Sequence, residues 1–131
     1  MKILLDTHTL LWFLEDNPRL SGKTKRLIEN LEYEVYVSIT SWFEISVKLT
    51  IGKLELPDSL TTTISKSTLN QIVTVGISED HAIAYEKLPL FETHKDPFDR
   101  MILATALTEG YALVSGDPKF NLYTTLVPLI W

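Results

Sequence analysis

The stretch Met1–Trp12, M-K-I-L-L-D-T-H-T-L-L-W, decides the fold. Residues 3–5, Ile-Leu-Leu, form a short continuous apolar run, which is typical of a strand buried on both faces of a parallel sheet. Asp6 follows this run directly, and Thr7 can open a helix. A carboxylate at the carboxyl end of a buried strand lies at the edge where open α/β sheets bind ligands. The stretch therefore predicts an α/β protein with a functional carboxylate at Asp6.

Composition and charge limit the class of protein. The chain has 131 residues, the usual size of one domain, and we expect a single domain over residues 1–131. It contains no cysteine, which excludes disulfides and thiolate metal sites. No stretch approaches the length of a membrane helix, so we expect a soluble protein with no membrane partner. The absence of cysteine permits the cytoplasmic location that we expect. The net charge of −5 argues against a nucleic-acid binder, unless local basic residues or metal ions supply positive charge.

Strand and helix signals alternate along the whole chain. Beyond residues 3–5, the pattern predicts strands at 35–39, 72–75, 111–115 and, at a sheet edge, 126–131. Caps and apolar spacing predict helices at 7–15, 21–32, 40–52, 58–70, 78–87 and 96–110. This alternation predicts a three-layer α/β sandwich with a mostly parallel central sheet.

Four carboxylates fall where a parallel sheet would aim them at one crevice. Asp6 ends the first strand, and Asp117 follows the fourth strand by one glycine. Glu44 lies on an otherwise apolar helix, and Asp99 lies in the first turn of the helix that Asp96 opens. Singly, each acid has a structural explanation as a cap, a turn residue or an ion-pair partner. Together they predict a shared site, because caps and turns do not require every acid to lie at the same sheet edge.

Such a cluster of acids favours a metal ion. Crowded carboxylates repel one another and raise each other's proton affinity unless a cation neutralises them. Mg²⁺ and Mn²⁺ prefer oxygen ligands, which fits a site made of Asp and Glu. These ions activate water and stabilise the charge that builds on a phosphodiester under in-line attack. We therefore predict hydrolysis of a nucleic-acid backbone without a covalent intermediate on the protein.

Neighbouring polar residues can support these acids. Thr7 and Ser115 each lie beside a strand-end acid, where they can donate to a carboxylate or cap the following segment. Arg100, with His94 and Lys95, flanks the third acid and could hold substrate phosphates, although solvated surface charge is the simpler interpretation.

Four segments together resemble the PIN domain and, within it, the VapC-type toxins of bacterial toxin–antitoxin pairs. They are L-L-D-T-H-T-L-L-W from residue 4, S-W-F-E-I-S-V-K from residue 41, H-K-D-P-F-D-R-M-I-L-A-T-A from residue 94 and L-V-S-G-D-P-K-F from residue 113. The resemblance covers essentially the whole chain in the right order. It implies a Mg²⁺- or Mn²⁺-dependent endoribonuclease in which a metal-activated water attacks RNA.

The resemblance also assigns residues by position. Asp6, Glu44 and Asp99 match the three core acids of the family, and Asp117 matches its more variable fourth. Asp96 is a recurrent companion in the H-x-D-P-F-D-R stretch of this subgroup. The expected metal ligands are Asp6, Glu44, Asp99 and Asp117, with Asp96 as a supporting residue.

The implied partners are an RNA substrate, a small antitoxin that wraps the toxin and blocks its groove, and a second copy of the chain. DNA binding in such pairs belongs to the antitoxin, which agrees with the acidic charge here. Large apolar residues near Trp12, Trp42 and Phe43 favour the homodimer. We interpret Trp42 and Phe43 as core or interface residues, and we assign no chemistry to His8.

Two other functions compete with this hypothesis. A haloacid-dehalogenase-like phosphatase would use Asp6 as a covalent nucleophile. That family requires a second Asp two residues later, where this chain has His8, and it has no use for Glu44. In a non-catalytic acidic binding module, the acids would only hold a structural ion or cap helices.

Overall fold

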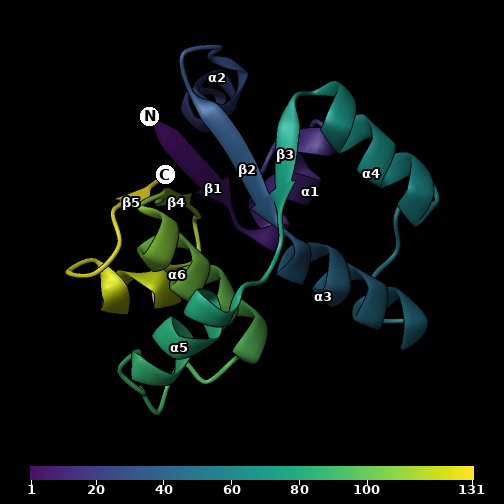
Figure 1. Cartoon of the computed structure of the whole chain (residues 1–131). Helices are drawn as coiled ribbons and strands as arrows, with labels where there is room; N and C mark the ends of the chain where they lie inside the picture. The colour runs from purple at the N-terminus through teal and green to yellow at the C-terminus, as the bar shows by residue number, and fades with distance from the viewer.

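A five-stranded sheet, with every strand parallel to its neighbours, forms the centre of the computed structural model, which describes residues 1–131 (Figure 1). The strand order is β3-β2-β1-β4-β5. The strands are β1 (Lys2–Leu5), β2 (Glu34–Ser38), β3 (Ile72–Val75), β4 (Ala112–Val114) and β5 (Leu129–Ile130). The helices are α1 (Thr7–Leu14), α2 (Gly22–Glu29), α3 (Ile39–Thr50), α4 (Leu60–Leu69), α5 (Glu79–Lys87), α6 (Pro97–Glu109) and the 3₁₀ helix η1 (Pro118–Tyr123).

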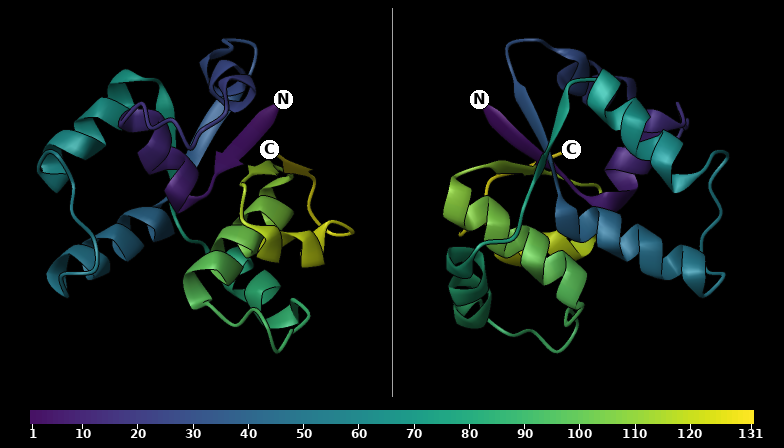
Figure 2. Two further views of the ribbon diagram at one scale, coloured as in Figure 1. Left: turned by 180° about the vertical axis from the view of Figure 1, so that it is seen from behind. Right: turned by 45° about the vertical axis from the view of Figure 1, so that its right-hand side comes forward.

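The sheet separates two apolar layers, and this confirms the predicted sandwich. Successive side chains of β1 point to opposite faces. Ile3 and Leu5 pack in a core with α1, α2 and α3, whereas Leu4 packs in a second core with α6. Figure 2 shows α1 and α4 on one side of the sheet and α5 and α6 on the other. Because both faces are covered, all three side chains are fully buried, as the continuous apolar run predicts.

Several element boundaries differ from the prediction for local reasons. Helix α3 begins at Ile39 rather than at 40 or 41, because the Ser38 hydroxyl accepts a hydrogen bond from the Thr40 amide and caps it. Helix α2 ends at Glu29, since the next residue, Asn30, has an extended backbone. The carboxyl-terminal edge strand is confined to Leu129–Ile130, and η1 was not predicted.

Helix α6 has the ends that the sequence marks. The Asp96 side chain accepts a hydrogen bond from the Asp99 amide, and Pro97 occupies the first turn. At the other end Gly110 has φ 73°, the left-handed conformation in which a glycine costs no steric strain. These caps fix Asp99 in the first turn of α6.

The order in which the chain adds strands to the sheet reverses at β1. The chain first builds β2 and β3 on one side of β1, and later β4 and β5 on the other side. Open α/β sheets bind ligands at such a switch point, outside the carboxyl ends of the strands. Asp6 follows β1 and residues 115–117 follow β4, so the topology brings these two segments together.

None of the helices combines the length and the apolar character needed to cross a membrane.

Candidate functional site

Asp6 lies at the carboxyl end of β1 and is only 5% exposed. One carboxylate oxygen accepts a hydrogen bond from the Thr9 amide at 2.8 Å, which caps α1. The other oxygen accepts a hydrogen bond from the Ser115 hydroxyl, which reaches across from β4. Burial raises the pKa of Asp6, and the hydrogen bonds from Ser115 and Thr9 oppose this rise without cancelling it. A nearby cation would therefore stabilise the ionised form of this acid.

Glu44 reaches the same edge from α3 and is also buried. Its Oε1 accepts a hydrogen bond from Thr7 Oγ1 at 2.7 Å. Its Oε2 lies 2.6 Å from Lys48 Nζ, and the two residues form an ion pair across four positions of the helix. Since Thr7 directly follows Asp6, one residue joins the strand-end acid to α3. The buried carboxylate distinguishes this pair from an ordinary surface ion pair.

Asp99 faces these acids from the first turn of α6, where its side chain is 23% exposed. Burial raises its pKa, and the negative charges of Asp96 and Glu44 raise it further, whereas His94 lowers it. Glu44 of α3 and Asp99 of α6 therefore lie near enough for their charges to interact. The Asp96 carboxylate itself accepts from the Asp99 amide at 3.0 Å, so its observed contact is that of a helix cap.

His94 holds Asp99 in place, a role that sequence reasoning missed. Its Nε2 lies 2.9 Å from Asp99 Oδ2, and its Nδ1 lies 2.9 Å from the Tyr123 hydroxyl. The imidazole is buried and packs edge-on against Phe120 and Tyr123. From its position beside Lys95, His94 was expected to bind a substrate phosphate. No local sequence pattern indicates that the 3₁₀ helix η1 covers the imidazole.

Asp117 lies at the switch point, just after β4. Its amide donates to Ser115 Oγ at 3.1 Å, and Ser115 in turn donates to Asp6. The Asp117 Oδ1 accepts from the Lys119 amide at 3.0 Å, which caps η1. Asp117 thus lies where the sequence predicts, connected to Asp6 through Ser115, with the contacts of a turn cap.

The acids do not form a ready-made metal centre. No three His, Asp or Glu side chains lie close enough together to hold one ion in this side-chain arrangement. Hydroxyls of Thr7 and Ser115 and the ammonium of Lys48 satisfy the carboxylates instead. The chemistry of the donor set still fits a hard divalent cation, because four segments at one sheet edge supply carboxylates and burial raises the pKa of Asp6 and of Asp99.

Arg100 is not available to hold a substrate phosphate, contrary to the sequence-based expectation. It is 5% exposed, and its guanidinium donates to the carbonyl oxygens of Pro89, Leu88 and Tyr85 at 2.9, 3.4 and 3.5 Å. Its guanidinium carbon also lies 5.0 Å from the centre of the Tyr85 ring. Each residue of a helix is rotated by about 100° from the one before it, so Arg100 points toward α5 although it follows Asp99.

The aromatic residues expected near a dimer interface divide into two kinds. Trp42 is a core residue, and its indole Nε1 donates to Thr74 Oγ1 at 3.1 Å. Phe43 is 62% exposed and packs edge-on against Phe98 of α6. Trp12 is half-buried. Of the three, only Phe43 is mostly exposed to solvent.

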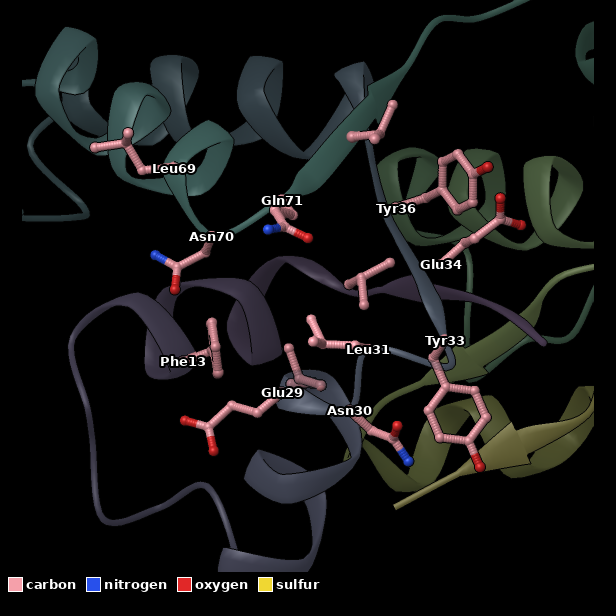
Figure 3. Close-up of a pocket in the computed structure, with 13 residues that line it drawn as sticks. Phe13, Glu29, Asn30, Leu31, Tyr33, Glu34, Tyr36, Leu69, Asn70 and Gln71 are labelled. Carbon is pink, nitrogen blue, oxygen red and sulfur yellow. The ribbon is translucent and has the colours of Figure 1, made fainter.

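A separate pocket of about 440 Å³ lies at the opposite edge of the sheet (Figure 3). Its walls include Asn30, Tyr33 and Glu34, which lead into β2, and Asn70 and Gln71, which lead into β3. Ligands bind open α/β sheets at the carboxyl ends of the strands. This pocket is at the amino ends and does not belong to the candidate site.

The fold and the acidic edge define a class of protein that comparison with known families identifies. The PIN domain matches residues 3–125, and the chain belongs to this family. It is 30% identical over 119 residues to Ribonuclease VapC22 of Mycobacterium tuberculosis, covering 91% of this chain and 89% of that protein. The family resemblance seen in the sequence is thereby confirmed, and the dehalogenase-like alternative for Asp6 is set aside.

Solved structures share the fold over nearly the whole chain. VapBC2 from Rickettsia felis, bound to a DNA fragment from their promoter, has a TM-score of 0.71 at 17% identity and covers 99% of this chain and 98% of that chain. A toxin-antitoxin complex from Klebsiella pneumoniae has a TM-score of 0.62 at 20% identity and covers 98% of this chain and 96% of that chain. At such identities the likeness shows the fold.

Proposed function

We propose that this chain is a divalent-metal-dependent endoribonuclease and the toxin of a toxin–antitoxin pair. The proposal rests on the buried acids Asp6 and Glu44 and on Asp99 beside them, at the switch point of a PIN-domain sheet. The raised pKa of Asp6 and of Asp99 supports it. The 30% identity to a protein named as a ribonuclease supports it. The substrate is RNA, and the reaction is hydrolysis of a phosphodiester bond.

Asp6, Glu44, Asp99 and Asp117 would hold Mg²⁺ or Mn²⁺, with Asp96 in support. A bound ion of this kind activates water and stabilises the charge that develops on the phosphodiester.

The other polar residues of the site orient these acids. Thr7 fixes Glu44, and Ser115 fixes Asp6. His94, anchored by Tyr123, fixes Asp99. Residues that hold metal-binding carboxylates in this way contribute to affinity and activity without touching the ion.

We further propose a single domain and a small antitoxin protein that covers the acidic edge. The name of the Klebsiella pneumoniae complex supports such a partner. The proposal also includes a homodimer formed through the exposed Phe43. It places the chain in the cytoplasm and assigns it no direct DNA binding. The net charge of −5 supports the last point, because non-specific DNA binding depends on positive charge.

The test is cleavage of end-labelled single-stranded RNA by the purified, antitoxin-free chain with Mn²⁺, with Mg²⁺ or with EDTA. We expect cleavage that requires the metal and is lost in Asp99→Asn, while the control Asp80→Asn, at an exposed acid of α5, cleaves normally. Binding of Mn²⁺ without cleavage of any RNA in a transcriptome-wide digest would instead indicate a non-catalytic acidic module.

A further inference from the structure

A second hollow opens directly beside the acids at the switch point. Its volume is about 360 Å³, within the range of about 300–1,000 Å³ found for small-ligand sites. Asp6 and Asp117 form part of its wall, so the hollow is continuous with the candidate site. The other lining residues are His8, Thr9, Trp12, Arg19, Gly116 and Trp131.

Three aromatic rings line this pocket. The rings of His8 and Trp12 are stacked, with centroids 5.8 Å apart and an angle of 30° between their planes. The Trp131 ring is tilted by 58° from that of Trp12, at 6.2 Å. His8 is exposed, and Trp131 is 39% exposed. Rings that are exposed in this way beside a cluster of acids are available to stack on a ligand.

Backbone pairing of β5 with β4 determines the position of Trp131. Strand β5 pairs with β4, and the Ser115 amide donates to the Ile130 carbonyl at 3.1 Å, which brings Trp131 beside Gly116. A Cβ atom at residue 116 would lie 2.5 Å from Trp131 Cε2. The indole therefore rests on a backbone that has no side chain, immediately before Asp117.

Arg19 adds a positive charge to the pocket. Its guanidinium carbon lies 5.9 Å from the centre of the Trp12 ring, and the residue is exposed. Arg19 forms none of the ion pairs in the structure. Aromatic faces next to a free arginine are the chemistry that binds a nucleobase and its phosphate.

We propose that this pocket is a base-binding subsite of the ribonuclease proposed above, on which the inference rests. An unpaired base of the RNA stacks on Trp131 and His8, and Arg19 contacts a neighbouring phosphate. The bound nucleotide places the adjacent phosphodiester at Asp6 and Asp117. Because a base that stacks on these protein rings must leave the base stack of a duplex, the subsite selects single-stranded RNA.

The test combines removal of the base with removal of the ring. Affinity for a fluorescent single-stranded RNA is measured by anisotropy in Ca²⁺, and abasic sites are scanned along the oligonucleotide. Stacking on an aromatic ring is worth about 1–3 kcal/mol per base, so one abasic position is expected to weaken binding by about 5- to 150-fold. Trp131→Leu is expected to weaken binding of the intact RNA by a similar factor, and to bind intact and abasic RNA equally.

Matched variants separate stacking from folding and from net charge. Trp131→Phe keeps a ring and should retain most of the affinity, and thermal melting shows whether each variant folds. Arg19→Gln should weaken RNA binding, whereas Lys87→Gln, with the same change of charge at the end of α5, should not. Equal losses for the two charge variants, or additive effects of the abasic site and Trp131→Leu, would overturn the subsite.

The same proteins distinguish this proposal from the nuclease proposal. If wild type binds RNA through the pocket but does not cut it with Mn²⁺, the nuclease proposal fails and the subsite stands. If wild type cuts RNA and Trp131→Leu cuts it with an unchanged KM, the subsite fails and the nuclease stands. If Trp131→Leu no longer binds the antitoxin but binds RNA normally, the pocket binds the protein partner and the proposed base-binding subsite is overturned.

Discussion

Thr7 Oγ1 donates a 2.7 Å hydrogen bond to Glu44 Oε1 from the residue that directly follows Asp6. The bond runs from the end of β1 to α3, and both side chains are buried, so water cannot replace it. The bond therefore resists any shift of α3 that would move Glu44 relative to Asp6. The hydroxyl sets the spacing between two of the candidate metal ligands.

Thr7→Val removes this hydroxyl and keeps the shape of the side chain. The buried Glu44 oxygen loses its donor, and we expect a loss of about 1–3 kcal/mol in the free energy of unfolding. Removing a group that orients a metal ligand typically lowers affinity or activity by about 10- to 100-fold, and we expect that loss in RNA cleavage and in Mn²⁺ affinity. Thr105→Val is the control, because the buried Thr105 hydroxyl donates only to the Met101 carbonyl within α6. A Thr7→Val protein with normal Mn²⁺ affinity would show that the bond does not serve the site.

Asp6→Asn is expected to abolish cleavage and to stabilise the fold at neutral pH. Burial raises the pKa of Asp6 in the folded state, so the protonated form folds more favourably than the ionised form. The contribution of this group to stability is full below the unfolded pKa of about 3.9 and is lost as the pH rises through the folded value. Asparagine stays neutral and can still accept from the Thr9 amide.

The measurement is thermal melting of Asp6→Asn and of wild type across the acidic to neutral range, without added metal. The stabilisation should be present near neutral pH and should shrink as the pH falls toward 4. Asp80→Asn, at an exposed acid in the first turn of α5, should show no such gain. If Asp6→Asn melts below wild type at neutral pH, the hydrogen bonds of Asp6 outweigh the burial of its charge.

Binding of Mn²⁺ should raise the melting temperature of wild type. A ligand that binds only the folded state stabilises it by about 2.7 kcal/mol at 100 times its dissociation constant. The cation also relieves the mutual repulsion of Asp99, Asp96 and Glu44. Asp99→Asn should lose most of this thermal shift and Asp80→Asn none of it. An equal shift in both variants would place the ion elsewhere on the chain.

Local patterns in the sequence predicted the sheet and the edge at which the acids gather. The run at residues 3–5 is apolar throughout because both of its faces are covered, and the caps of α6 can be read directly from Asp96 and Gly110. The strand order was not predicted, because it depends on pairing between segments far apart in the chain.

Contacts made across the fold were the part that the sequence did not reveal. Arg100 follows Asp99, yet the rotation of the helix directs it to the carbonyls at the end of α5. His94 is held by a hydrogen bond with the Tyr123 hydroxyl. Trp131 packs against Trp12 only because β5 pairs with β4. Such contacts follow from tertiary packing, which neither periodicity nor spacing encodes.

Arg100→Met is expected to destabilise the protein and to leave RNA recognition intact. The guanidinium satisfies three carbonyls near the end of α5, and its loss leaves partly buried acceptors without a donor. We expect the free energy of unfolding to fall by about 1–3 kcal/mol. The KM for RNA, measured well below the melting temperature, should equal that of wild type. A KM raised as much as in Arg19→Gln would instead return Arg100 to the set of phosphate-binding residues.

Gly116→Ala tests the base pocket through the backbone. The new methyl group would overlap the Trp131 ring, which must move away because the rest of the loop is held by the hydrogen bonds of Ser115 and Asp117. Trp131 is 39% exposed, so its ring can shift at small cost to stability. We therefore expect a melting temperature close to that of wild type, an altered tryptophan emission spectrum and an RNA affinity reduced as far as in Trp131→Leu. Gly76→Ala is the matched control, because a Cβ there meets no other atom. An RNA affinity that is unchanged while the tryptophan emission shifts would mean that the indole at this position does not contact the substrate.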